Sequence, residues 1–303
     1  MQEKIIILGS NGVIGNGIFL ALKNKFKILK INSSAYDINN NRYKLNYFKK
    51  SDYFIHAAGV TEEEINKFGY KRSFLRANLE TKKLLKYLIK QSCKNFIYIS
   101  SSRIYSDVTT HQSEGKTKID LDEHYKVCHF TTENLIKNLA NRYNLNYLIL
   151  RPGATYGFSF NKKKLNRVKL IPYSFPISLY KNQQITLKTS GIQKRNFCSN
   201  IDIGNKVKKW ILKKNKHSII SNVLGDKICS VKTFANICIK IYFKVFKKKG
   251  IIVYNKKFKK TLEKKLIVTQ VLKSKNTQKV ENFLSDLFVM MKKNKIKKNT
   301  YKL

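Results

Sequence analysis

The chain has 303 residues, of which 42% are hydrophobic, so it can form one large domain or a domain with a smaller lobe. Its formal net charge is +44, with 54 lysines and only 8 arginines. Specific recognition of phosphates and bases favours the planar guanidinium of arginine. We therefore expect a solvated basic surface and no specific nucleic-acid site, with weak association with an anionic membrane as an alternative.

Cysteine usage and hydropathy indicate a cytoplasmic protein. The five cysteines form no C-x-x-C pair, which favours a reducing compartment and argues against a zinc site. The first apolar run has only five residues and no stretch approaches a membrane span, so we expect neither a signal peptide nor a transmembrane helix. A peripheral position at the inner face of the membrane stays open.

Strands and helices alternate through the first half of the chain. We expect strands over Lys4–Leu8, Phe26–Ile31, Tyr36–Ile38, Tyr53–Ala57, Asn95–Ser100 and Tyr147–Leu150, and helices over Val13–Leu22, Phe74–Lys90 and Glu123–Tyr143. This pattern predicts an α/β fold with a parallel sheet covered on both faces. The alternation fades after Gly153. We expect a cofactor domain over residues 1–157, a mixed lobe over 158–291 that returns to the core around 195–225, and a basic, disordered tail over 292–303.

A glycine-rich turn follows the first expected strand. Gly9, Gly12 and Gly15 form a G-x-x-G-x-x-G pattern directly before an apolar helix. A Cβ atom there would block both the tight turn and the approach of phosphates to the backbone N–H groups. The turn therefore predicts a nucleotide cofactor, which we expect to be bound by the three glycines with Asn11, Val13 and Ile14.

Further motifs follow the glycine turn in a fixed order. They are Asp37-Ile38, the run from Ser51 to Gly59, Asn78 in Ala-Asn-Leu-Glu-Thr, Phe96 to Tyr105, Arg151 to Gly157, and Arg195 to Asp202. Over residues 3–225 the chain resembles the extended short-chain dehydrogenase/reductase family, the NAD-dependent epimerase/dehydratase group that acts on nucleotide sugars. The resemblance implies a Rossmann-type doubly wound sheet with a C-terminal substrate-binding lobe, a nucleotide-sugar substrate and, by family default, a homodimer. It also implies cofactor contacts from Asp37, Ile38, Ala57, Ala58, Gly59 and Asn78, and substrate contacts from Ser101, Ser102 and Arg195.

The resemblance also implies the catalytic groups. Hydride transfer from a sugar carbinol requires removal of the hydroxyl proton, which a tyrosine can accept if its pKa falls from about 10 toward neutrality. Tyr125 takes this acid/base role and Ser101 is the hydroxyl partner. The family places a lysine four residues after the tyrosine, on the same helix face, to lower its pKa and hold the nicotinamide ribose. Here His129 occupies that position, and Lys126 lies about 100° round the helix.

Three interpretations of His129 are open. It is a working but slower replacement for the lysine, most helpful when protonated, that also binds the cofactor ribose. Alternatively, the site has lost turnover and kept binding. In the third interpretation Tyr125 is an ordinary helix tyrosine outside any active site.

The form of the cofactor is open as well. Family members that prefer NAD carry an acid at the end of the second strand, where it binds the adenosine ribose 2′-hydroxyl. Here the segment Ile31-Asn32-Ser33-Ser34 holds no acid before Asp37. The sequence therefore predicts NAD or NADP.

The residues and the resemblance together predict an NAD(P)-dependent epimerase or reductase of a nucleotide-linked sugar, in the synthesis of cell-surface polysaccharide precursors. Dehydration is less favoured, because Ser102-Arg103 stand where a dehydratase of the family carries an Asp-Glu pair. One alternative is a catalytically weakened or inactive nucleotide-sugar-binding protein. A second alternative is a peripheral-membrane or polyanion-binding protein on a Rossmann scaffold.

Overall fold

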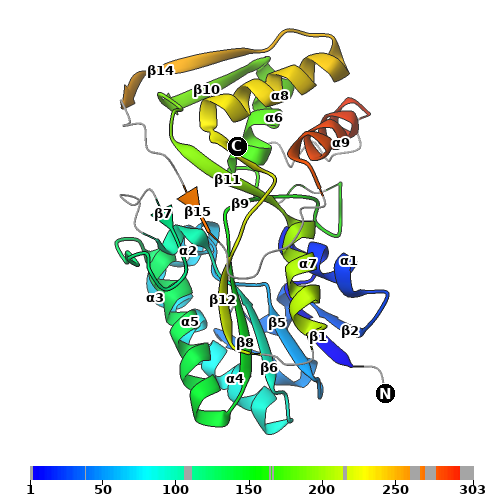
Figure 1. Cartoon of the computed structure of the whole chain (residues 1–303), viewed down its shortest axis with the longest axis vertical. Helices are drawn as coiled ribbons and strands as arrows, with labels where there is room; N and C mark the ends of the chain where they lie inside the picture. Colours follow the sequence, from blue (N-terminus) through cyan, green and yellow to red (C-terminus); the bar gives the residue numbers. More distant parts are fainter. Residues whose placement is uncertain are drawn as a thin grey trace.

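The computed structural model describes residues 3–37, 39–105, 111–163, 165, 167–213, 217–259, 267–269 and 278–293. These residues form a larger α/β part, which contains the N-terminus, and a smaller part above it in Figure 1. Ile38 and the expected basic tail from residue 294 onward lie outside the described residues.

A six-stranded parallel sheet forms the centre of the larger part. Its strands are β1 (Lys4–Leu8), β2 (Lys27–Ile31), β5 (Tyr53–His56), β6 (Asn95–Ile99), β8 (Asn146–Pro152) and β12 (Ile219–Val223), in the order β12-β8-β6-β5-β1-β2. All five strand pairs are parallel, which confirms the predicted fold class. Strand β12 has no counterpart among the predicted strands.

Helices cover both faces of this sheet. Successive side chains of β1 point to opposite faces, so Ile5 and Ile7 pack in one apolar cluster and Ile6 and Leu8 in another. The covering helices are α1 (Val13–Leu22) and α7 (Asn200–Ile211) on the first face, and α4 (Thr81–Lys90) and α5 (His124–Tyr143) on the second.

Helices α1 and α7 are fastened to each other at their first turns. The buried Asn200 amide donates to the carbonyl of Val13 at 2.8 Å and to that of Phe158 at 3.2 Å. The start of the chain is therefore held by a segment that follows much later in the sequence.

Two predicted elements differ from the structure. The expected third strand is present as β3 (Tyr36–Asp37), but it pairs antiparallel with β4 (Arg42–Tyr43) outside the central sheet. The connection from β2 is too short for a parallel crossover, which needs a dozen or more residues.

The expected helix Phe74–Lys90 is divided by a π-helical turn. This region comprises α2 (Glu62–Phe68), α3 (Tyr70–Leu75), the π turn Arg76–Glu80 and α4.

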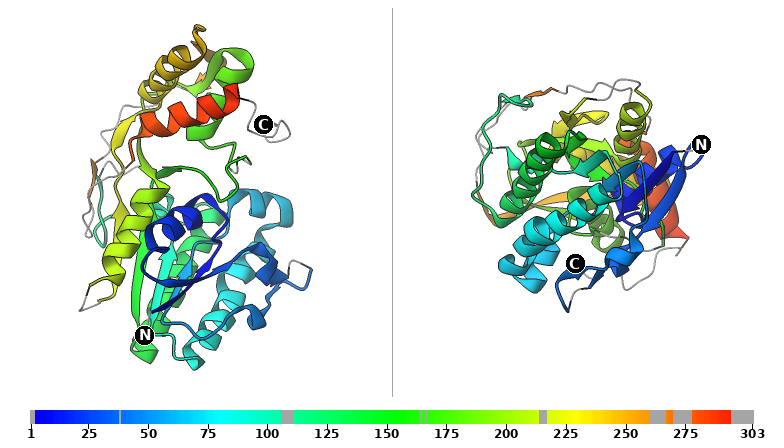
Figure 2. Two further views of the ribbon diagram at one scale, coloured as in Figure 1. Left: turned by 90° about the vertical axis from the view of Figure 1, so that its right-hand side faces the viewer. Right: turned by 90° about the horizontal axis from the view of Figure 1, so that it is seen from below.

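The smaller part has its own apolar core. It contains β9 (Ala154–Tyr156), β10 (Gln184–Thr189), β11 (Lys194–Ser199), β13 (Lys227–Ser230) and β14 (Ile251–Lys259), with helices α6 (Ile171–Asn182), α8 (Val231–Phe246) and α9 (Val280–Lys292). The last of these helices, red in Figure 2, packs against α8. Short elements elsewhere are the pair β7 (His111–Gln112) and β15 (Ile267–Val268), and the 3-10 turns Ser33–Ala35, Leu45–Tyr47 and Ser102–Ile104.

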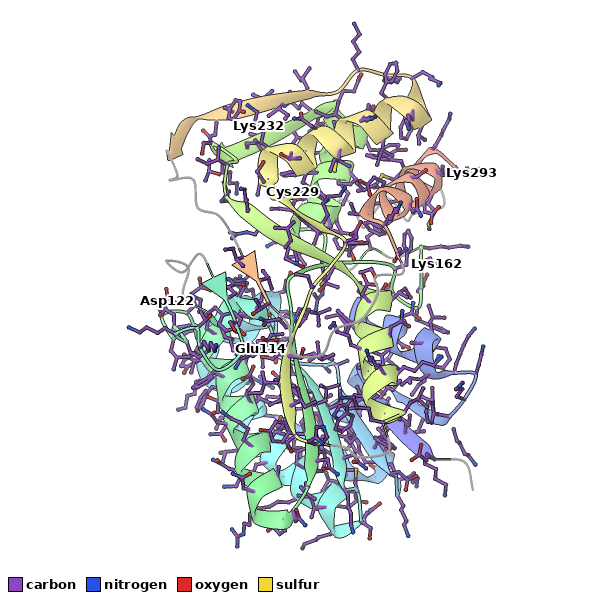
Figure 3. The ribbon with its side chains drawn as sticks, in the orientation of Figure 1. Glu114, Asp122, Lys162, Cys229, Lys232 and Lys293 are labelled. Atoms are coloured by element: carbon purple, nitrogen blue, oxygen red, sulfur yellow. The ribbon has the colours of Figure 1, made fainter. Side chains whose placement is uncertain are left out.

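Surface lysines occur on both parts of the molecule. Lys162, Lys232 and Lys293, labelled in Figure 3, are exposed and belong to three different segments. Across the described ranges, the helices all lack the length and apolar character that crossing a membrane requires.

A buried ion pair joins α5 to the sheet. Arg151, at the end of β8, contacts Glu133 through two bonds of 2.6 and 3.0 Å, and the two side chains are 4% and 0% exposed. Arg151 also donates to the Tyr105 hydroxyl, which in turn donates to Asn222 of β12. The network thus connects one helix with two strands.

Removing one partner of this buried pair should be costly. We expect Glu133→Ala to lower the free energy of unfolding by about 3–5 kcal/mol, because Arg151 would remain buried without its counter-charge. Glu281→Ala, which breaks the exposed pair with Lys227, is the control and should cost at most about 1 kcal/mol. Urea unfolding of both variants measures the difference, and equal costs would contradict the prediction.

Candidate active site

A cleft of about 1050 Å³ opens at the carboxyl ends of the central strands. Many of the predicted site residues line it, namely Gly9, Asn11, Gly12, Val13, Ile14, Ala57, Ala58, Gly59, Ser101, Tyr125 and His129. The structure therefore brings the glycine turn and the three expected catalytic residues to a single cavity.

The glycine turn has the geometry that its sequence implies. Gly9 has a φ of 88°, and a Cβ atom there would lie 2.9 Å from the carbonyl group of Ala57. A Cβ at Gly15 would lie 2.1 Å from the Gly9 oxygen. Gly15 does not line the cleft itself; its missing side chain lets α1 approach the turn.

The polar groups around the turn fit a dinucleotide. Helix α1 begins after Gly12 without a side-chain cap, so its first N–H groups and its dipole are available to an anion. Ser100, which follows β6, also lines the cleft, and its buried hydroxyl has no partner among the described residues. These donors fit NAD or NADP, with the diphosphate on the turn between Gly9 and Ile14.

Ser101 and Tyr125 lie on neighbouring elements of the cleft wall. Ser101 is 7% exposed, and its oxygen accepts a bond from the Arg103 N–H at 3.2 Å, which leaves the hydroxyl proton free for a ligand. The Arg103 guanidinium carbon lies 4.9 Å from the centre of the Tyr125 ring. Arg103 is also bound by Glu62 at 2.6 Å and by Glu123. The cation beside Tyr125 is thus largely neutralised by two carboxylates.

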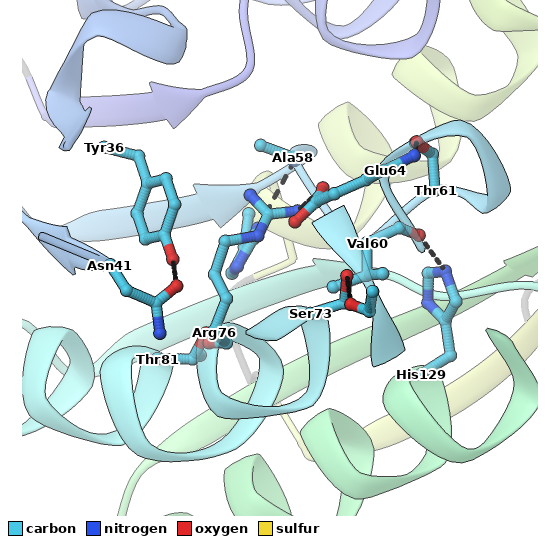
Figure 4. A network of polar contacts seen from close by, with 12 residues as sticks. Tyr36, Asn41, Ala58, Val60, Thr61, Glu64, Ser73, Arg76, Thr81 and His129 are labelled. Atoms are coloured by element: carbon cyan, nitrogen blue, oxygen red, sulfur yellow. Dashed lines mark hydrogen bonds and ion pairs between the residues drawn. The ribbon is translucent and has the colours of Figure 1, made fainter. Parts of the chain in front are cut away.

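His129 is fixed by the protein at both ring nitrogens. Nδ1 accepts from the Tyr98 hydroxyl at 2.7 Å, and Nε2 donates to the Val60 carbonyl at 3.1 Å; Figure 4 shows the second contact. Burial lowers the pKa of His129 to about 3. Burial disfavours the charged imidazole, so the protonated form of His129, in which it was expected to be most helpful, is not favoured near neutral pH.

Lys126 does not compensate for the missing lysine. Its side chain is 1% exposed, and its ammonium pairs with Asp122 at 2.7 Å. Lys126 is not among the residues that line the cleft.

Several predicted contact residues lie outside the cleft lining. They are Asp37, Asn78, Ser102 and Arg195. The carboxylate of Asp37 accepts bonds from Asn39 and Asn40. Arg195 is exposed on β11, opposite Cys229. Asn78 lies in the π turn, where Arg76 lines the cleft in its place.

Four cationic residues of the cleft wall were missed by the sequence reasoning. They are Arg72, Arg76, Arg167 and Lys169. Arg76 reaches the cleft through the π turn and pairs with Glu64 at 2.6 Å, as Figure 4 shows. Arg167 has a φ of 68° in the segment before α6. No motif marks these positions in the sequence.

Comparisons with known proteins agree with this geometry. A family model described as the NAD dependent epimerase/dehydratase family matches residues 5–221. No curated protein matches the chain. Similar solved structures include UDP-glucuronic acid 4-epimerase from Bacillus cereus, in complex with UDP-glucuronic acid and NAD (17% identity, TM-score 0.77, 96% of this chain and 99% of that chain). A second is UDP-N-acetylglucosamine 4-epimerase from Methanobrevibacter ruminantium (16% identity, TM-score 0.78, 97% of this chain and 99% of that chain). A third is UDP-glucose 4-epimerase from Thermotoga maritima (16% identity, TM-score 0.75, 96% of this chain and 99% of that chain). At these identities the likeness shows a shared fold.

Two buried histidines, His129 of the cleft lining and His56 at the end of β5, should make stability depend on pH. Burial lowers the pKa of His56 and of His129 to about 3, against about 6.5 for an exposed imidazole. Their contribution to the free energy of unfolding is fully present above about pH 6.5 and is lost as the pH falls toward 3. Between these two values the histidines take up protons in the unfolded chain but not in the folded protein. We expect the free energy of unfolding to decrease below about pH 6.5 by up to about 1.4 kcal/mol per pH unit for each histidine.

Urea titrations between about pH 7 and pH 4 measure this slope. The variant His129→Gln carries an amide that can also donate and accept, and it should flatten the slope. The same slope in both proteins would show that His129 is not held neutral by the fold.

Proposed function

Because the chain belongs to the NAD dependent epimerase/dehydratase family, we propose that it is an NAD(P)-dependent epimerase of a nucleotide-linked sugar. The observation that carries this proposal is that Ser101 and Tyr125 line the same cleft as the glycine turn. Structural neighbours named as epimerases of UDP-sugars support a UDP-sugar as substrate. The epimerised sugar would serve as a precursor of cell-surface polysaccharides.

The proposed chemistry uses two hydroxyl groups of the chain. A nicotinamide cofactor held at the glycine turn would supply the hydride acceptor for the sugar carbinol. Ser101 would donate a hydrogen bond to the reacting sugar hydroxyl and orient it. Tyr125 would take the proton of that hydroxyl and give it back when the hydroxyl re-forms.

Electrostatic support for Tyr125 is weak in this proposal. Arg103 provides the neighbouring positive charge, but Glu62 and Glu123 bind the same guanidinium. His129 stays neutral and contributes packing and hydrogen bonds only. We therefore expect slow turnover.

A second candidate function is nucleotide-sugar binding without turnover. The specific observation in its favour is the neutral, fully bonded His129 at the position of the family's lysine. Such a protein would keep the cleft and its backbone donors but would lack a usable charge beside Tyr125.

Turnover of a panel of UDP-, dTDP- and GDP-sugars with NAD and NADP tests the proposal. We expect a low kcat for the native chain and a loss of about 10²–10⁴-fold in Tyr125→Phe, which lacks the proton-transferring hydroxyl. Tyr143→Phe, at the exposed end of the same helix, is the matched control and should keep the native kcat. The variant His129→Lys, which adds a charge beside Tyr125, should raise kcat by about tenfold or more.

The outcomes separate the two candidates. Activity that survives in Tyr125→Phe would contradict the assigned acid/base. Calorimetric binding of a nucleotide sugar without turnover in any variant would favour the binding protein. Absence of both binding and turnover would overturn both candidates.

A further inference from the structure

The end of β2 lies directly beside the glycine turn. The carbonyl of Ile31 accepts bonds from the N–H groups of Gly9 at 2.8 Å and Ser10 at 3.3 Å. Asn32 therefore follows β2 at the level of the turn, and it lines the cleft. In dinucleotide-binding folds this position, about 20 residues after the turn, faces the 2′-hydroxyl of the adenosine ribose.

The side chain at this position is neutral and presents a donor. The Asn32 carbonyl oxygen accepts from both the N–H and the hydroxyl of Ser34, so its NH₂ group remains for a ligand. The next acid, Asp37, is bonded to Asn39 and Asn40 and does not line the cleft. The ribose hydroxyls of NAD would therefore lack the carboxylate that usually accepts their hydrogen bonds at this position. The 2′-phosphate of NADP would not be repelled, because Asn32 is uncharged.

Two arginines, Arg72 and Arg76, line the same cleft as Asn32. The guanidinium carbon of Arg76 lies 5.3 Å from the centre of the ring of Tyr36, which follows Asn32 by four residues and also lines the cleft. Arg76 is bound by Glu64, as Figure 4 shows. Arg72 lines the cleft, and none of the described carboxylates is within ion-pair distance of it.

The acids of the wall do not reverse this balance. Glu63 and Glu64 are the two carboxylates among the lining residues, against the four cations Arg72, Arg76, Arg167 and Lys169, and Glu64 is bound by Arg76. An arginine without a carboxylate partner suits a phosphate, because its planar fork can bind two phosphate oxygens at once.

We propose that the cleft selects NADP(H) over NAD(H), with Asn32 and Arg72 receiving the adenosine 2′-phosphate. This inference rests on the proposed function only in requiring that the cleft binds a nicotinamide dinucleotide. It assigns a preference that the family description, which names NAD, does not contain.

Equilibrium binding tests the preference without any need for turnover. Titration of the full chain, followed by nicotinamide fluorescence, should show NADPH binding at least about tenfold tighter than NADH, which is the effect of one charge-assisted contact. Asn32→Asp keeps the acceptor for Ser34 and adds a negative charge, so it should reduce or reverse the ratio. Arg72→Gln should weaken NADPH and leave NADH unchanged. Arg142→Gln, near the end of α5, is the control and should change neither.

A pair of fragments isolates the 2′-phosphate. Adenosine 2′,5′-bisphosphate should displace NADPH more effectively than 5′-AMP, since the two differ only in that group. Equal or tighter binding of NADH by the native chain, or an unchanged ratio in Asn32→Asp, would overturn this inference and leave the proposed function standing. Failure of both dinucleotides to bind would overturn the proposed function as well.

Discussion

One backbone acceptor sets the geometry of the cleft. The Ile31 carbonyl binds the N–H groups of Gly9 and Ser10, which aligns the ends of β1 and β2 and turns the chain toward α1. The backbone amides at the start of α1 and the side chain of Asn32 are positioned by this same contact. Because a Cβ at Gly9 would collide with Ala57, glycine is the residue that permits it.

The other end of the cleft depends on a neutral imidazole. A lysine would bring a mobile charge to Tyr125, whereas His129 is fixed between Tyr98 and Val60. Both partners are satisfied by the ring, so the substitution is accommodated by a complete set of hydrogen bonds. The only cation in contact with the Tyr125 ring, among the residues described, is Arg103, and its charge is shared with two glutamates. The hydrogen bonds around His129 are thus complete, but Tyr125 has no unshared positive charge in contact with its ring among the residues described.

Local patterns predicted the fold better than the site. The bounds of β1 and α1 follow directly from apolar spacing, and glycine spacing marked the turn between them. The π turn at Arg76–Glu80 could not be foreseen, because its residues continue the ordinary helical pattern of the segments on either side. The state of His129 was likewise hidden, since it depends on Tyr98 and Val60, which are distant in sequence. Arg167 carries no motif at all.

The bond from Asn200 to Val13 has a consequence for synthesis on the ribosome. The glycine turn emerges before the amide that fastens it, which is 187 residues further along the chain. At about 5–20 residues per second, translation needs about 10–40 seconds to supply that partner. Strand β12, beside β8 in the sheet, arrives later still. The nascent chain therefore cannot fasten the glycine turn to α7 until the segment around Asn200 has been made.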